Sequence, residues 1–275
     1  MIGKSFLSLI VAGSVRSFIH KIGLIPFSKV MKNPDLNLLN ESIAAFDNVL
    51  PKTGLENKGV KVISAKNHNQ ILDLFEPNYS RLYKFLSRKN PEIAQYLRKH
   101  HLPRANSIMN GKNASFLIRT KDVILNKEKG APLLFHELGH ALNSNKKGIG
   151  KVLHTLRRPV ALLYPLILWA ALLKPKKQDG EKPQGFFDKA TPFIKNQCGK
   201  LAFAVHIPLL LEEGLASIKG SKLAKEFLSK KSLKSLNKLN FAAWLTYLGA
   251  VTAMTLQTVT VSKSQDEFRE PKKTA

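Results

Sequence analysis

Two histidines four positions apart, His136 and His140, constrain this chain more than any other feature of its sequence. On an α-helix a step of four residues advances about one turn, so both imidazoles project from one face and can bind a single ion. The surrounding residues favour a helix, because Pro132 suits a first helical turn and apolar residues then recur at helical spacing. The sequence therefore predicts a partly buried helix that offers a pair of metal ligands.

Glu137 directly follows the first of these histidines and lies roughly a quarter turn from it around the helix. At that offset the carboxylate stands beside the open side of a bound metal ion, where it can take a proton from water. The pattern His-Glu-x-x-His is a signature of zinc hydrolases. The alternative is a surface or core helix that carries two incidental histidines.

Two further carboxylates, Glu212 and Glu213, end an apolar helical run in the second half of the chain. Acidic groups in such a setting are costly unless they are paired or bound to a metal. A catalytic zinc usually takes three protein ligands and leaves one position open, so either glutamate is a candidate for the third ligand. Helix registers read from sequence slip easily, and Glu212 therefore stays an alternative to Glu213.

His-Glu-Leu-Gly-His followed at a distance by Glu-Gly-Leu-Ala resembles the gluzincin branch of the zincin metallopeptidases, in which a second helix supplies a glutamate ligand. The likeness covers mainly residues 113–145 and 205–225. Membrane-bound zinc peptidases are the nearest likeness within that group. Because the likeness is confined mainly to those two segments, it indicates the chemistry better than the substrate.

This resemblance implies a ligand set and a base. His136, His140 and Glu213 would bind Zn²⁺, Glu137 would be the catalytic base, and the substrate would be a peptide or a protein. Many gluzincins have an aspartate four residues after the glutamate ligand, and it orients one of the ligand histidines. This chain has Ser217 there, whose hydroxyl can take the same place without supplying a charge.

Short strands are expected directly ahead of the histidine helix, at residues 114–119 and 123–125, and an additional strand is indicated at residues 59–63. Zincins have a hairpin in this position, and its edge strand pairs with extended substrate. A hairpin that only packs under the helix is equally compatible with these residues. The expected fold class is mainly α with a small antiparallel β-sheet, a zincin-like catalytic core with appended apolar transmembrane helices.

Three uncharged apolar runs cover residues 160–173, 201–211 and 241–261. Only the last, about 31 Å long as a helix, comfortably spans a hydrocarbon core of about 30 Å. A crossing over 152–173 and a return over 199–211 would bring Glu213 back to the side of the two histidines. A soluble protein with two buried helices satisfies the same constraint.

The formal net charge of +25 implies attraction to polyanions, which include nucleic acids and anionic membranes. Lysine outnumbers arginine 35 to 9 and is spread along the chain, whereas base recognition relies on the arginine fork. We therefore expect anionic membrane lipids as partners and no nucleic acid. Lysines near the expected site place it on the cytoplasmic side of the membrane. The single cysteine, Cys198, excludes an intramolecular disulfide.

The distribution of apolar, basic and helix-forming residues along the chain divides it into five segments. They are an apolar and basic N-terminal segment (1–30), a helical N-terminal region (31–112), a zincin-like catalytic region with apolar helices at 152–173 and 199–211 (113–240), a transmembrane helix (241–261) and a charged, disordered tail (262–275). The N-terminal segment is compatible with a signal peptide or with an amphipathic helix at a membrane surface.

The prediction is a zinc-dependent endopeptidase, membrane-associated, that hydrolyses peptide bonds with a metal-activated water. One alternative is a non-catalytic, basic membrane-surface protein with a degenerate zincin core, and another is a soluble zinc peptidase. His206 is close in sequence to Glu213 and could donate a hydrogen bond to the oxyanion, although a core histidine is the better interpretation.

Overall fold

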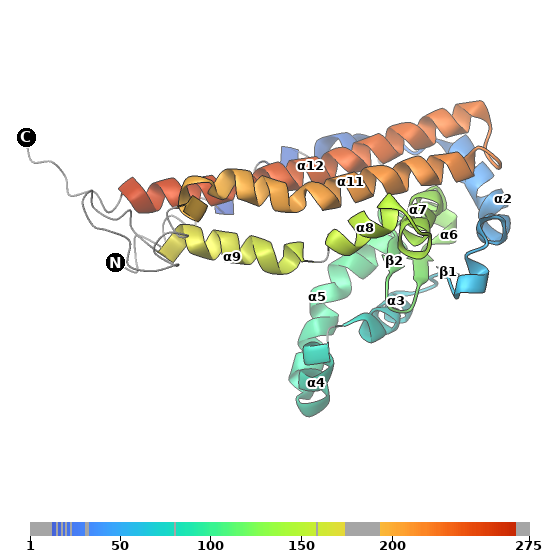
Figure 1. Ribbon diagram of the computed structural model, residues 1–275. Coiled ribbons are helices and arrows are strands. Elements are labelled where there is room, and N and C mark those ends of the chain that lie inside the picture. The colour runs from blue at the N-terminus through green and yellow to red at the C-terminus, as the bar shows by residue number, and fades with distance from the viewer. Residues whose placement is uncertain are drawn as a thin grey trace, which may run out of the picture. The chain divides into compact units, whose positions relative to one another are not determined.

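The computed structural model describes residues 33–79, 81–157, 159–173 and 193–267, together with residues 24–30 and some positions between 13 and 22. Its described part is mostly helical with one small sheet (Figure 1). The chain divides into two compact units. The sheet unit comprises Lys29–Thr155 and Glu212–Phe241, and the apolar unit comprises Met1–Ser28, Leu156–Leu211 and Ala242–Ala275.

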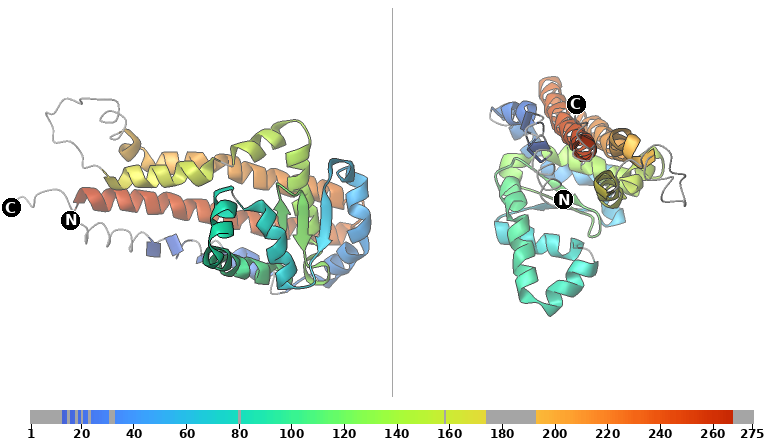
Figure 2. Two further views of the ribbon diagram at one scale, coloured as in Figure 1. Left: turned by 90° about the horizontal axis from the view of Figure 1, so that it is seen from below. Right: turned by 90° about the vertical axis from the view of Figure 1, so that its left-hand side faces the viewer.

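The sheet has three strands, β1 (Lys61–Ser64), β2 (Ser115–Leu117) and β3 (Asp122–Leu125), which lie side by side in the order β1-β3-β2 (Figure 2). Strands β2 and β3 form the expected antiparallel hairpin. Strand β1 pairs with β3 in parallel, so the prediction of a purely antiparallel sheet was wrong and the sheet is mixed. The reason lies in the connection, because the helices between β1 and β2 supply the crossover that a parallel pair requires.

The sheet is covered on both faces, and the central strand β3 shows this most clearly. Val123 and Leu125 pack into one hydrophobic cluster, with helices α2 (Leu36–Thr53) and α7 (Leu133–Asn145). Ile124 faces the other way, into a second cluster with α3 (His68–Phe75) and α5 (Pro91–Met109). The remaining short elements of this unit are η1 (Glu56–Lys58), η2 (Glu76–Asn78), α4 (Arg81–Lys89), α6 (Lys127–Gly130) and α8 (Ile149–Leu156).

Side-chain caps set where several helices of the sheet unit begin. The Asp35 carboxylate accepts hydrogen bonds from the first-turn amides of α2, and Asn67 does the same for α3. Asn90 caps α5, with Pro91 at its first position. These residues satisfy amide groups that have no partner within the helix, and they thereby fix the helix starts.

The apolar unit contains α9 (Val160–Leu173) and parts of two long helices, α11 (Cys198–Ala224) and α12 (Lys230–Glu267). Helices α11 and α12 run antiparallel and side by side (Figure 1), and within this unit the Trp244 indole N–H donates to the Leu210 carbonyl at 3.0 Å. By length and composition, α11 and residues 230–263 of α12 are long and apolar enough to cross a membrane. The predicted membrane helix 241–261 is thus the middle of a longer helix.

The structure corrects the predicted crossing at 152–173. Helix α8 ends at Leu156 and a separate helix, α9, begins at Val160. Pro159 has no amide hydrogen to donate to a preceding turn, while its carbonyl accepts from the amides of Leu162 and Leu163 and so starts α9. With 14 residues, α9 is about 21 Å long, which is less than the thickness of a hydrocarbon core.

The predicted tail, 262–275, is not wholly irregular, because residues 262–267 continue α12. Lys, Gln and Glu in this stretch have a high helix propensity, and extending an existing helix is easier than starting a new one. The remainder of that tail, residues 174–192 and the first residues of the N-terminal segment lie outside the described residues.

Candidate metal centre

Helix α7 carries the His-Glu-Leu-Gly-His sequence, as predicted. Its fully buried Leu134, Leu138 and Ala141 pack into the cluster that covers one face of the sheet. The helix ends at Asn145, and Gly148 follows with a positive φ of 118°, a backbone conformation that favours glycine. Burial of the apolar side therefore fixes how the helix is rotated, and with it the direction of both imidazoles.

Two glycines allow α7 and α11 to approach each other closely within the sheet unit. A Cβ atom at Gly139 would overlap the backbone carbonyl of Ala216, and one at Gly220 would overlap the carbonyl of Phe135. Any side chain at either position would push the two helices apart. Gly139 and Gly220 are thus the reason why α11 can bring a carboxylate within reach of the α7 histidines.

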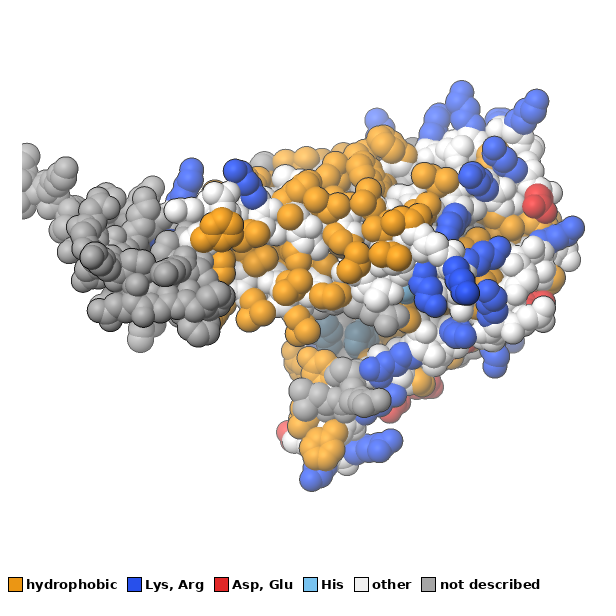
Figure 3. Space-filling model, in the orientation of Figure 1, with side chains coloured by type: hydrophobic (Ala, Val, Ile, Leu, Met, Phe, Trp, Pro, Cys, Tyr) orange, Lys and Arg blue, Asp and Glu red, His pale blue; other side chains and the backbone are white. Residues whose placement is uncertain are grey.

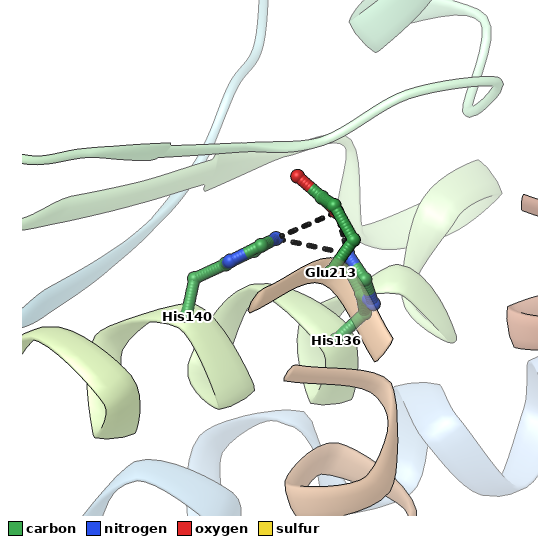
Figure 4. Close-up of side chains that lie close together, drawn as sticks. All are labelled: His136, His140 and Glu213. Atoms are coloured by element: carbon green, nitrogen blue, oxygen red, sulfur yellow. Dashed lines mark hydrogen bonds and ion pairs between the residues drawn. The ribbon is translucent and has the colours of Figure 1, made fainter. Parts of the chain in front are cut away.

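Three ligand atoms meet where these helices cross. Nε2 of His136 and Nε2 of His140 are 3.0 Å apart, and each lies 3.3 Å from Oε2 of Glu213. Figure 4 shows the Glu213 side chain reaching from α11 toward both imidazoles of α7. The Glu213 side chain is 1% exposed, and those of His136 and His140 are 12% and 8% exposed.

These atoms fit a metal ion. Tetrahedral coordination with bonds of about 2.0–2.1 Å separates neighbouring ligand atoms by about 3.3 Å, close to the spacing observed here. Neutral imidazole nitrogens and a carboxylate oxygen are also ligands that divalent transition metals bind. His136, His140 and Glu213 could therefore hold a metal ion.

The electrostatics of the group favour a cation. Burial alone would lower the pKa of His140, but the negative charge of Glu213 and the hydrogen bonds that the imidazole donates to Glu212 and Glu213 outweigh it and raise the pKa to about 10. The same carboxylates that favour a positive charge on this imidazole would favour a bound divalent cation.

Both histidines have partners at the ring nitrogen that faces away from the group. Nδ1 of His136 lies 3.1 Å from the Ser217 hydroxyl, so the expected hydroxyl partner is in place. Nδ1 of His140 lies 2.9 Å from Oε1 of Glu212. With Nε2 kept free for a metal, each Nδ1–H donates to its oxygen, which holds the tautomer and the ring direction.

Glu212 and Glu213 therefore have different positions in the site. Glu213 joins the group of three ligand atoms, whereas the Glu212 carboxylate contacts the outer nitrogen of His140. Glu137, which stands between the two histidines in the sequence of α7, is 9% exposed, and its charge contributes to the raised pKa of His140. Glu212, the alternative that the sequence left open, is thus a hydrogen-bond partner of His140, which is one of the three candidate ligands.

Two residues of the site have no signal in the sequence. Asn143 and His154 both contact the Glu212 carboxylate, at 3.0 and 3.3 Å. Asn143 is three residues beyond His140 on the same helix, but His154 comes from a separate helix, α8. His206, the suggested oxyanion donor, belongs to the apolar unit, where its Nδ1 contacts the Ala202 carbonyl at 2.6 Å.

Comparison of the chain with models of protein families, with curated proteins and with solved structures finds no match.

Proposed function

We propose that this protein is a zinc-dependent endopeptidase of the gluzincin type, attached to a membrane. The observation that carries the proposal is that Nε2 of His136 and Nε2 of His140, both on α7, lie 3.0–3.3 Å from one another and from Oε2 of Glu213 on α11, while α7 also carries Glu137. The two imidazoles and one carboxylate supply three ligands, which is the number typical of catalytic zinc sites. A structural site would more often be closed by a fourth protein ligand.

The residues around the site have distinct tasks in this proposal. When bound, zinc lowers the pKa of a water and polarises the scissile carbonyl as a Lewis acid. The Glu137 carboxylate takes the proton of the attacking water and passes it to the leaving amine nitrogen. The Ser217 hydroxyl and the Glu212 carboxylate keep the two histidines oriented.

Removal and return of the metal test this function. Full-length protein purified in detergent should hydrolyse an unstructured protein such as casein, lose this activity on treatment with a zinc chelator, and recover it with stoichiometric Zn²⁺. The loss follows because neither the water nor the carbonyl is activated without the ion. Purified protein that binds no zinc would contradict the proposal and favour a non-catalytic protein with a degenerate zincin core.

Exposed apolar side chains support attachment to a membrane. On α9, Leu162, Leu166 and Trp169 are 72%, 58% and 60% exposed, and on α11 Ile207 and Leu211 are 40% and 54% exposed. Figure 3 shows hydrophobic side chains gathered over these helices of the apolar unit. An apolar surface of this extent is costly in water, and the two candidate spanning helices contribute to the same unit.

The basic residues support a cytoplasmic site and contacts with anionic lipids. Exposed lysines follow the site at the end of α11, in the turn after it and at the start of α12, namely Lys222, Lys225, Lys230, Lys231 and Lys234. Lysines close to membrane-spanning segments favour the cytoplasmic side and are attracted to anionic lipids there. Because Glu213 and these lysines belong to the sheet unit, this unit would face the cytoplasm.

Extraction from cell membranes distinguishes a spanning protein from one held by charge. We expect high salt to leave the full-length chain in the membrane fraction and detergent to release it. Salt screens the attraction of lysines to anionic lipids but does not weaken the burial of apolar helices in lipid. Immunoblots of both fractions provide the measurement, and complete release by salt would favour the soluble peptidase.

A further inference from the structure

The Glu212 carboxylate is at the centre of a hydrogen-bond network behind the metal ligands. Its side chain is fully buried, and its Oε1 atom lies within hydrogen-bond distance of three nitrogens. These are Nδ1 of His140 at 2.9 Å, Nδ2 of Asn143 at 3.0 Å and Nδ1 of His154 at 3.3 Å. A buried carboxylate needs such partners, because they replace the hydration that it has lost.

The hydrogen bonds have a defined direction when His140 binds a metal through Nε2. The Nδ1–H of His140 then donates to Glu212, and the Asn143 amide donates to the same oxygen. The Nδ1–H of His154 supplies the third donor. The position of the carboxylate, and through it the His140 ring, is therefore set by residues of both α7 and α8.

Helix α8 is packed so that His154 reaches this carboxylate. A Cβ atom at Gly150 would lie 2.6 Å from Oδ1 of Asn143 and 2.8 Å from Nζ of Lys219, so a larger residue would require both side chains to shift. The His154 ring is 3% exposed and lies 6.4 Å, between centroids, from the ring of Phe116 on strand β2. The histidine is thus held between β2 and Glu212.

We propose that His154 is a positioning residue of the metal centre, which acts on His140 through Glu212. His154 contacts none of the three ligand atoms, yet it helps to fix the carboxylate that orients one ligand. The affinity for zinc should therefore depend on a helix that lies outside both ligand-bearing sequences. This inference rests on the proposed function only in the identity of the ion.

Zinc affinity of three variants tests the proposal. In full-length protein, competition with a chromophoric chelator should show that His154→Leu weakens zinc binding about tenfold, the lower end of the range for partners of metal ligands. His154→Asn keeps an N–H donor near the position of Nδ1 and should stay within about threefold of the unchanged chain. Glu212→Gln should weaken binding by about 10–100-fold without abolishing it.

A matched control separates positioning from general damage to the fold. His206→Leu removes another buried histidine, in the apolar unit, whose Nδ1 contacts a main-chain carbonyl, and it should leave the zinc affinity unchanged. The visible absorption spectrum of bound Co²⁺ should change in His154→Leu and return toward that of the unchanged chain in His154→Asn. A purely structural role would not produce this pattern.

The outcomes distinguish this inference from the proposed function. Unchanged zinc affinity in His154→Leu, or equal losses in His154→Leu and His206→Leu, would overturn the positioning role alone. A chain that binds zinc with the predicted dependence on His154 but hydrolyses no peptide would support the positioning role and overturn the peptidase. A chain that binds no zinc would overturn both.

Discussion

The Glu137→Gln chain is expected to keep one zinc ion and to hydrolyse peptides at least about a hundredfold more slowly than the unchanged chain. Glutamine has nearly the same shape as glutamate but cannot accept the proton of the attacking water. The side chain at position 137 contributes none of the three ligand atoms, so the substitution leaves the metal bound. General-base catalysis of this kind contributes about 10²–10⁴-fold, which sets the size of the expected loss.

Hydrolysis of a fluorogenic peptide and zinc content measured on the same preparation are the two readouts for Glu137→Gln. Glu226→Gln is a matched control, because Glu226 is an exposed glutamate of the same unit. We expect both variants to contain zinc and only Glu226→Gln to retain activity. Full activity in Glu137→Gln would refute its role as the base.

Gly139→Ala is expected to destroy the metal centre through packing alone. The added methyl group would overlap the Ala216 carbonyl, and a backbone carbonyl in a helix cannot move aside as a side chain can. Helices α7 and α11 must then separate, which takes Glu213 out of reach of the two histidines. Overpacking typically costs about 1–3 kcal/mol, and it exceeds the gain of up to about 1 kcal/mol from replacing glycine in a helix.

Zinc affinity and the thermal unfolding midpoint measure the effect of Gly139→Ala. The unfolding midpoint and the zinc affinity should both fall. Because one of three ligands is displaced, the affinity should fall by more than a hundredfold, and a hundredfold loss corresponds to about 2.7 kcal/mol of binding free energy. Gly199→Ala is the control, because its methyl group would meet the Val259 side chain in the apolar unit. Zinc binding by Gly139→Ala with unchanged affinity would show that the helices do not need this close approach.

The histidine helix could be predicted from sequence because its signals are local. The apolar residues recur at helical spacing, and Pro132 and Gly148 bracket the segment on either side of α7. The β2–β3 hairpin was equally accessible, since both strands and their turn are contiguous. In each case the residues that decide the structure are close together along the chain.

The long-range features of the site could not be read in this way. The side that Glu212 and Glu213 each face depends on the rotation of α11, which is set by its packing at Gly220 and not by its own pattern. His154 sits in an apolar helix like any buried histidine, and only the fold brings it to Glu212. Likewise, the parallel pairing of β1 depends on where the intervening helices return the chain.

A zinc-edge anomalous diffraction map from crystals of the full-length chain tests the central claim most directly. The account predicts one strong peak per chain, at about 2.0–2.2 Å from Nε2 of His136, Nε2 of His140 and a carboxylate oxygen of Glu213. A peak bound by Glu212 in place of Glu213, or no peak in crystals grown with stoichiometric zinc, would contradict it.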